Sequence, residues 1–509
     1  MAKLYNNRLA EYVGNNGGRA ILLFLLFALS IYEFIHAGFG TFAIICISPI
    51  VVLFVYVAFN WRMSVFWMLI VANWFIQFKN VNWHIPMSLI DEMLELTLIG
   101  IAIIDARYTP HFERTWNFML FVIMIWCGFC LIEIMNDTCG LGMNINAWFS
   151  GARLMALQLV WIILVFTLYI STPDNLMTYL RIWAGLSLFS AFWTWKMINI
   201  GFTDTENQWL YSVGYVTHLL NGGTLTRYWS TFSDAANYGC NASASAVAFL
   251  IFGITAKIKK DKILFLITSA IVVWGMFQSG TRTAMFTLIA GFIVFLVLAK
   301  SFKIMVPSAI IGGLFFIFLV FTDIGNGNQQ IRRMRSAFDK KDASANVRDI
   351  NKASIAKYMK DAPWGIGIGI FTENIPAWNR YKLLSEIPPD SEYVFIWVRT
   401  GPIGVTIFTC CMVLILLGGC IIVLFRLKSP SLIGIGGGLC SAFVSIQLGA
   451  YANQVLYQYP NGLTFFGGMA IVYLLPYIED EWIEYEKKRF DKEAEQKRLK
   501  LEKKLAKRV

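Results

Sequence analysis

Long apolar runs recur along almost the whole of the 509-residue chain, and they constrain its fold more than any other feature. Each run is long enough to cross the ~30 Å of hydrocarbon in a bilayer as one helix. Because 57% of the residues are hydrophobic and only 15% are charged, a soluble protein of this size could not bury the apolar surface. The sequence therefore predicts an all-α polytopic membrane protein with 12–14 transmembrane helices. The runs begin near residues 20, 39, 62, 86, 115, 152, 175, 236, 262, 282, 303, 401, 431 and 462.

The basic residues predict on which side of the membrane each connection lies, because Lys and Arg accumulate in short cytoplasmic loops. With a cytoplasmic N-terminus, the basic clusters within 257–262 and 300–303 both fall inside, as does the Lys/Arg-rich C-terminus. The run at 20–37 has no A-x-A-like cleavage site before the next run, so it is predicted to be an uncleaved first span. The net charge of +11 is accordingly attributed to topology and not to nucleic-acid binding.

This topology divides the chain into four parts. We expect a transmembrane bundle at 1–322, a large outer loop at 323–390, further transmembrane helices at 391–478 and a charged cytoplasmic tail helix at 479–509. The outer loop contains eleven Lys/Arg and eight Asp/Glu, an excess of positive charge that favours an anionic partner.

The loop itself is predicted to be partly helical. Residues 346–361 have helical spacing, with Ile350, Ile355 and Met359 on an apolar side, and the PWGIGIG segment that begins at Pro363 ends the helix. A short helix is expected at 390–399, lying at the outer interface before the next span begins near 401.

The turn between the runs that begin at 262 and 282 holds Arg282 within the sequence FQSGTRTAMF. An arginine beside a membrane core is costly unless it is used, although it is also typical of a side chain that snorkels to anchor a helix end. Ser279 and Thr281 make the turn small and polar at the start of a helix, where free N–H groups and a guanidinium together suit a phosphate.

Three further arginines are candidates for the same ligand. Arg227 lies beside Trp229 in an aromatic segment that suits sugar rings or lipid headgroups, and an ordinary aromatic belt is the alternative. Arg348 lies on the predicted loop helix, where Asp349 is an alternative partner. Arg335 lies in a basic run that is also compatible with contact to lipid headgroups.

Carboxylates are needed if a sugar hydroxyl is to be deprotonated. Asp390 and Glu392 lie at the entry to the short helix after the loop. Asp91 and Glu95 lie one helical turn apart inside a predicted span, where an arginine partner is as plausible as catalysis.

Two kinds of site are not expected. The GIGIG motif at 365–369 lacks the strand and the βαβ context of a dinucleotide fingerprint. The nine cysteines lie mostly in apolar runs and show no zinc spacing, so neither a metal nor a cofactor is predicted.

Five short motifs, in this order along the chain, resemble the O-antigen ligase and O-antigen polymerase superfamily. They are RYWSTFSDAAN at 227–237, SGTRTA at 279–284, SANVRD at 344–349, PWGIGIG at 363–369 and DSEYVFIWVRTGPIG at 390–404. The resemblance runs from about residue 225 to 425, and the earlier spans agree only in hydropathy.

The resemblance implies a metal-independent glycosyltransferase of the bacterial inner membrane, with an undecaprenyl-pyrophosphate-linked glycan as donor on the periplasmic side. Arg227, Arg282 and Arg348 would bind and activate the pyrophosphate leaving group. Ligases of this family usually carry a histidine after the large loop, and this chain has Asp390 there. The difference favours a polymerase of O-antigen, capsule or exopolysaccharide repeats over a ligase to lipid A core.

Such an enzyme implies a growing glycan or lipid acceptor, contact with membrane lipids and other polysaccharide-assembly proteins as partners. A transporter or flippase of lipid-linked sugars is the main alternative from another class, since many spans and buried charges also describe transporters. A non-catalytic member of an assembly machine is a third possibility.

Overall fold

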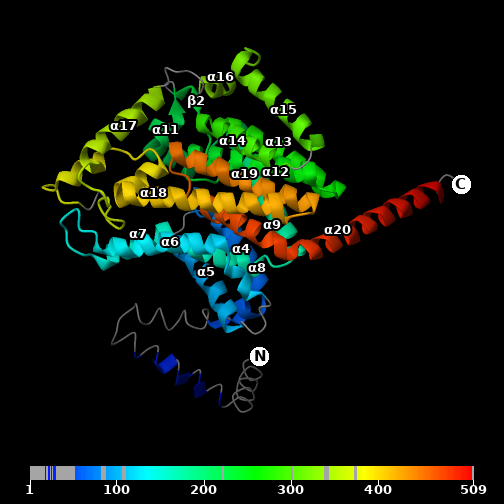
Figure 1. Ribbon diagram of the computed structural model, residues 1–509, viewed down its shortest axis with the longest axis horizontal. Coiled ribbons are helices and arrows are strands. Elements are labelled where there is room, and N and C mark those ends of the chain that lie inside the picture. Colours follow the sequence, from blue (N-terminus) through cyan, green and yellow to red (C-terminus); the bar gives the residue numbers. More distant parts are fainter. Residues whose placement is uncertain are drawn as a thin grey trace, which may run out of the picture. The chain divides into compact units, whose positions relative to one another are not determined.

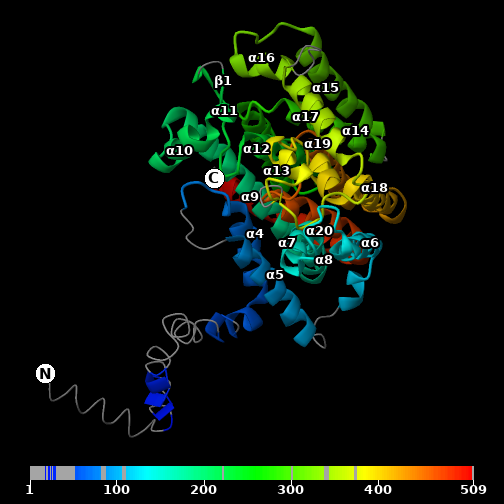
Figure 2. The same ribbon diagram turned by 90° about the vertical axis from the view of Figure 1, so that its left-hand side faces the viewer.

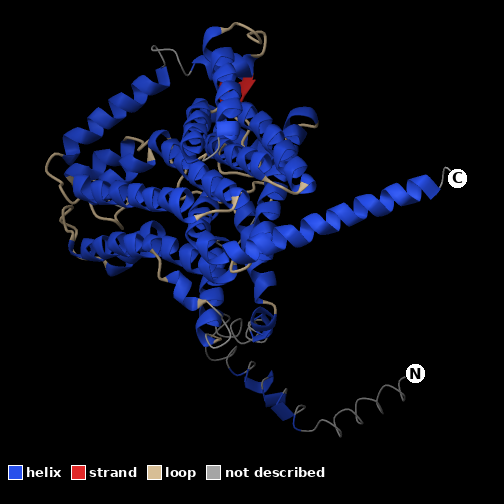
Figure 3. Ribbon diagram, turned by 45° about the vertical axis from the view of Figure 1, so that its right-hand side comes forward, coloured by secondary structure: helices blue, strands red, loops and turns tan. Residues whose placement is uncertain are grey.

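The computed structural model describes parts of residues 18–32 and most of 52–506, with gaps at 55, 82–86, 106–110, 221–222, 300–301, 337–342 and 372–374. It divides into two compact units, residues 1–65 and 66–509, and the predicted spans near 20 and 39 lie largely outside the described residues. The described part is almost entirely helical (Figure 3), with one antiparallel pair of two-residue strands, β1 (Leu219–Leu220) and β2 (Leu225–Thr226). The α-helices are α4 (Arg62–Phe75), α5 (Met87–Ile104), α6 (Phe118–Ile132), α7 (Ile145–Ala152), α8 (Gln158–Tyr169), α9 (Pro173–Asn199), α10 (Asp204–Trp209), α11 (Tyr215–His218), α12 (Ala235–Thr255), α13 (Lys259–Gln278), α14 (Arg282–Leu298), α15 (Phe302–Phe321), α16 (Gln329–Arg335), α17 (Ala343–Met359), α18 (Glu392–Ile421), α19 (Pro430–Ala452) and α20 (Gly467–Ala506).

The predicted all-α polytopic class is confirmed. Among the described residues, seven helical segments are long and apolar enough to cross a membrane. Other predicted spans are present as helices but are shorter or less apolar: α14 has 17 residues, and α9 carries Asp174, Arg181 and Lys196. The total of 12–14 spans therefore stays a prediction. The seven segments are Phe118–Met135, Ile145–Tyr169, Ala235–Thr255, Lys259–Gln278, Glu392–Arg426, Pro430–Ala452 and Gly462–Glu495.

Helix α12 is among the most deeply buried of the seven spans, and α13, α14 and α19 pack around it (Figure 1, Figure 2). Small residues allow this close approach, as is usual between helices in a membrane. Polar side chains within the packing bond one another: Ser243 shares a hydrogen bond with Thr287 at 2.7 Å, and the Asn241 amide donates to Asn461 Oδ1 at 2.8 Å. These helices form a tightly packed centre whose ends position the candidate site.

The large loop has an apolar core of its own. As predicted, it contains a helix, α17, and on its apolar side Ile355 and Met359 are buried. Ile350, expected on the same side, is 63% exposed. The short helix predicted at 390–399 and the span predicted from 401 are joined in α18, with a break at Gly401, whose φ is +66°. The apolar core of the loop also includes two residues from outside it, Cys139 and Val398. Its buried members are Cys139, Ile355, Met359, Ala362, Ile366, Ile375, Tyr381, Leu384 and Val398.

The segment 363–369 joins this loop to the bundle through backbone contacts. Its N–H groups at Ile366 and Gly367 donate to the carbonyls of Val398 and Arg399 at 2.9 and 3.0 Å. A Cβ at Gly365 would overlap the Arg399 carbonyl, and one at Gly369 would overlap the backbone of α7. Glycine is therefore needed where the two backbones touch, which is the structural use of the GIGIG motif.

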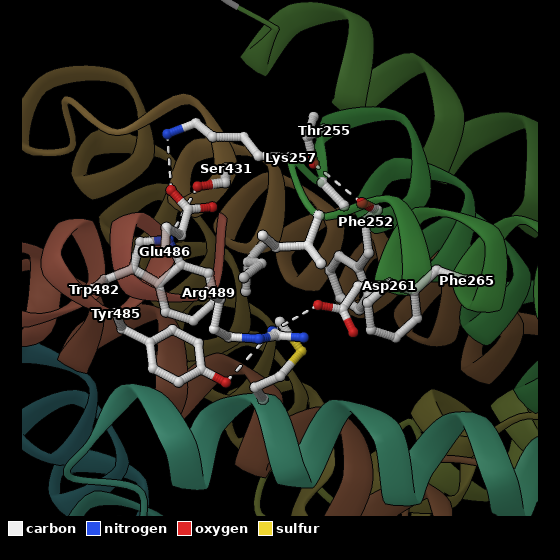
Figure 4. A pocket seen from close by; sticks show the side chains of 14 residues that line it. Phe252, Thr255, Lys257, Asp261, Phe265, Ser431, Trp482, Tyr485, Glu486 and Arg489 are labelled. Carbon is white, nitrogen blue, oxygen red and sulfur yellow. Dashed lines mark hydrogen bonds and ion pairs between the residues drawn. The ribbon is translucent and has the colours of Figure 1, made fainter. Parts of the chain in front are cut away.

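The last span and the charged tail are one continuous helix. Helix α20 extends well beyond the helices against which it packs (Figure 1). Ion pairs hold it where it leaves them (Figure 4): Arg489 Nη1 lies 2.7 Å from Asp261 Oδ2, and Lys257 Nζ lies 2.7 Å from Glu486 Oε2. Arg181 of α9 takes the other oxygen of Asp261 at 2.8 Å.

Candidate active site

A cavity of about 590 Å³ lies where α12 and α14 begin and where α13 and α19 end. Four arginines from four separate segments line it: Arg227, Arg282, Arg333 and Arg348. Of the described residues that line the cavity, one is a carboxylate, Asp234. The lining is therefore strongly cationic, as an anion-binding site requires.

The tight turn before α14 organises three of these arginines. Arg282 is the first residue of α14, and its Nη1 donates to Ser336 Oγ at 3.4 Å. The carbonyl of Ser279 accepts from Arg227 Nε at 3.3 Å, and that of Gly280 accepts from Arg333 Nε at 2.6 Å. The backbone of the turn thus holds Arg227 and Arg333, which come from distant segments, next to Arg282.

Small side chains and one left-handed residue make this turn possible. Gly280 has a φ of +57°, which favours glycine. A Cβ on Gly239 of α12 would lie 2.7 Å from Thr281 Cβ, so the turn rests directly on that helix. Ser279 is fully buried, donates its Oγ to the Met276 carbonyl and does not line the cavity, whereas Thr281 does. We therefore assign Ser279 to the architecture of the turn.

Arg227 follows β2 and is held by neutral oxygens. Its Nη1 donates to the Thr217 carbonyl at 2.9 Å and its Nη2 to Thr281 Oγ1 at 3.1 Å. Burial lowers the pKa of its guanidinium, and the charges of Arg282 and Arg348 lower that pKa further, while Asp234 opposes them. Arg227, Arg282 and Arg348 line one cavity, so their charges repel one another.

Arg348 brings the large loop to the same cavity. It lies on α17, and its Nη2 donates at 3.3 Å to Oδ1 of Asn453, the residue that follows α19. The structure thus brings together the three arginines proposed from the sequence and adds Arg333, which was seen only as one member of a basic run.

Asp234 and His218 also line the cavity, but both serve the start of α12. Asp234 accepts from the N–H groups of Ala236 and Asn237 at 2.7 and 2.9 Å. His218 Nε2 accepts from the Ala235 N–H at 3.1 Å, which leaves Nδ1 as the protonated nitrogen. Burial and the nearby Arg227 lower the pKa of His218 to about 4, so the ring is neutral at ordinary pH.

Three residues expected at the substrate lie elsewhere. Trp229 is 0% exposed and stacks on Phe202, so it belongs to an aromatic core. Arg335 bonds Asn326 and the carbonyls of Phe318 and Ile324, and thereby closes the end of α15. Glu392 is 4% exposed and accepts from the Leu456 N–H at 3.1 Å. None of the three lines the arginine cavity, and each makes these contacts within the protein.

A comparison with known protein families finds a match in the part of the chain that supplies three of the four cavity arginines. Residues 263–409 match the family model described as O-antigen ligase. This region belongs to the O-antigen ligase and polymerase superfamily. The matched residues include Arg282, Arg333 and Arg348, whereas Arg227 and helices α19 and α20 lie outside the match. No curated protein matches the chain.

Asp390, also within the O-antigen ligase region, lines a second cavity of about 360 Å³. Its Oδ2 accepts from Asn351 Nδ2 at 2.8 Å. The second cavity shares Arg348, Tyr451 and Ala452 with the first, so the two adjoin along these residues. Asp390 therefore lies next to the arginine cavity and not inside it.

The acids of α5 lie outside both linings and contact side chains of neighbouring segments. Glu92 pairs with Arg153 at 3.1 Å, Asp91 accepts from Asn73, and Glu95 accepts from Gln158. An arginine partner was the alternative to catalysis for Asp91 and Glu95. In the structure the acid that has such a partner is Glu92, which lies between them. Within the described residues no cluster of three His, Cys, Asp or Glu side chains is arranged to hold a metal.

Proposed function

We propose that this O-antigen ligase-type protein is a polymerase that transfers an undecaprenyl-pyrophosphate-linked glycan to the end of a growing glycan. The observation that carries the proposal is the convergence of Arg227, Arg282, Arg333 and Arg348 on one cavity. A pyrophosphate presents several anionic oxygens, and guanidinium groups match them with paired N–H donors.

The chemistry follows from neutralising the leaving group. An acceptor hydroxyl oxygen forms a bond to the anomeric carbon while the bond from that carbon to the pyrophosphate oxygen breaks. The bonding electrons leave with the lipid pyrophosphate, whose growing charge the arginines stabilise. The hydroxyl proton passes to Asp390 or to water. In this scheme the arginines supply the positive charge, so we propose that the reaction needs no metal.

The position of the site along the helices supports a periplasmic reaction. The cavity lies at the first residues of α12 and the last of α13, whereas the basic cluster at 257–262 joins the opposite ends of these helices. Since short basic loops are retained in the cytoplasm, the cavity is expected to face the periplasm of a bacterial inner membrane.

A polymerase is favoured over a ligase because Asp390 stands where ligases usually carry a histidine. A ligase would require lipid A core as acceptor, whereas a polymerase requires a second copy of the lipid-linked glycan. A flippase would move the lipid-linked glycan across the bilayer without forming a glycosidic bond.

Purified protein in lipid nanodiscs, supplied with lipid-linked repeat units, tests the proposal. We expect lengthened glycans, release of undecaprenyl pyrophosphate in equal amount and no loss of rate with EDTA. Product that forms only after lipid A core is added would identify a ligase. Donor binding without any new glycosidic bond would overturn the enzyme proposal.

A further inference from the structure

The second cavity is built by two facing helical stripes. On α17, Arg348, Asn351, Lys352 and Ile355 follow the spacing i, i+3, i+4, i+7 and therefore share one face. On the other side, Tyr393, Val394 and Trp397 of the first turns of α18 line the cavity together with Asp390, which precedes the helix. The end of α19 closes the space.

The lining combines aromatic rings with hydrogen-bonding groups. Tyr393, Trp397 and Tyr451 supply the rings, while Asp390 and Asn351 supply acceptors and donors. A pyranose ring has apolar C–H faces and a rim of hydroxyls, so this combination suits a saccharide. A polyprenyl tail would require an apolar lining throughout, and the two cations of this lining, Arg348 and Lys352, are balanced by Asp349 and Asp390, so it lacks the excess of positive charge found in the arginine cavity.

The side chains of this cavity are held in place by their neighbours. Tyr393 donates its hydroxyl to Gln447 Oε1 at 2.9 Å, and Trp397 packs against the apolar core of the loop. Asn351 orients Asp390 at 2.8 Å. Such support is expected of a binding site, because it reduces the entropy lost when a ligand is bound.

We propose that the second cavity binds the acceptor saccharide, the sugar whose hydroxyl attacks the donor. The inference rests on the proposed function of the arginine cavity. Because Arg348, Tyr451 and Ala452 line both spaces, a glycan in the second cavity presents its terminal hydroxyl beside the pyrophosphate-linked sugar in the first. Asp390 then lies on the acceptor side, where it takes the hydroxyl proton as the new bond forms.

The test varies acceptor and donor separately. The acceptor probe is the repeat-unit oligosaccharide freed from its carrier by mild acid, and the donor is the intact lipid-linked unit. For Trp397→Ala we expect KM for the acceptor to rise about tenfold, since one aromatic contact is lost, with KM for the donor unchanged within about twofold. Trp397→Phe keeps a ring and should show a smaller rise. Trp378→Ala is the control, since Trp378 lies on the adjoining large loop, is 76% exposed and is outside both linings.

The outcomes separate the two proposals. If the wild-type protein elongates glycans and Trp397→Ala and Trp397→Phe, both folded by thermal unfolding, leave acceptor KM unchanged, the acceptor site is wrong and the polymerase stands. Equal rises in both KM values would also contradict a separate acceptor site. If the wild-type protein forms no glycosidic bond, the proposed function itself fails.

Discussion

The two ends of α12 and α13 carry arginine clusters that differ in what the guanidinium groups meet. At the end near α20, Arg181 and Arg489 each contact one oxygen of the buried Asp261. At the other end, the hydrogen bonds of Arg227 and Arg348 go to carbonyl, hydroxyl and amide oxygens, which carry no formal charge. The first cluster shares a buried carboxylate within the protein, whereas Arg227 and Arg348 lie on the wall of a cavity.

This difference separates a structural use of arginine from a ligand-binding use. Buried charges are normally paired, and removing one partner is destabilising because the other charge is left uncompensated. The Asp261 cluster should therefore contribute to stability and not to catalysis. The cavity cluster should contribute to catalysis by binding an anion and stabilising the charge that develops on it. Four predictions, from the largest expected effect to the smallest, test this contrast.

Arg282→Ala should lower the rate of glycan elongation by about 10²–10³, the usual loss when one preorganised donor to developing charge is removed. Arg282→Lys keeps the charge but loses the paired N–H groups, so its loss should be smaller, on the order of tenfold. Elongation rates of purified variants measure both. Arg489→Ala, at the opposite end, should keep the rate within about threefold; equal losses at both ends would remove the distinction.

Asp261→Ala should lower the free energy of unfolding by about 2–3 kcal/mol, because it removes the shared partner of two arginines. Thermal unfolding in detergent measures the loss, and the elongation rate per folded molecule should stay unchanged. The control is Glu484→Ala, which removes an exposed ion pair with Lys488 on the same α20 helix and should leave Tm unaltered. A variant that keeps its Tm but stops elongating would assign Asp261 to the reaction.

Gly280→Ala should lower the elongation rate about tenfold, about 1.4 kcal/mol in activation free energy. The new Cβ would lie 3.2 Å from Arg227 Cγ and from Arg333 Cδ, so it should displace both side chains from the turn. Gly140→Ala is the matched control: its φ is +63° and nothing lies within 4 Å of the added Cβ. Both variants carry the same backbone strain, so only a loss confined to Gly280→Ala supports the positioning role of the turn.

His218→Gln should flatten the dependence of stability on pH. The pKa of His218 falls from 6.5 to about 4 on folding, so between these values the unfolded chain binds more protons than the folded one. Stability is therefore lost as pH falls through this range, by about 1 kcal/mol between about pH 7 and about pH 5.5. Glutamine retains an acceptor for the Ala235 N–H without titrating, and Tm measured against pH in both proteins shows whether the slope decreases. Equal slopes would mean that His218 does not titrate in this way.

The sequence predicted what depends on local pattern. Apolar length predicted the helices around α12, and the helical spacing of 346–361 predicted α17. Arg282 stood out because a charge in a turn between two apolar runs is costly. The meeting of Arg227, Arg282 and Arg348 depends on how segments some 120 residues apart pack together, which no local pattern records.

The differences between the expected and the observed positions of side chains have the same physical origin. Trp229 was predicted at the substrate because an aromatic residue next to an arginine has the same sequence pattern in a core as at an interface. Arg333 and Arg335 lie two residues apart on a seven-residue helix, and only the structure shows that Arg333 faces the cavity while Arg335 turns back to α15. No pattern in the sequence around His218 indicates its position at the cavity, since its hydrogen-bond partner is the backbone N–H of Ala235, 17 residues away.

The backbone contacts of the segment 363–369 leave the large loop little freedom of adjustment. At Gly365 and Gly369 one main chain lies against another with no side chain between them, so no change of rotamer can absorb a small displacement. A displacement of this segment should therefore break its backbone hydrogen bonds with α18. Arg348 and Asp390 flank the segment in the chain, so we expect the same displacement to move both side chains out of the cavities that they line.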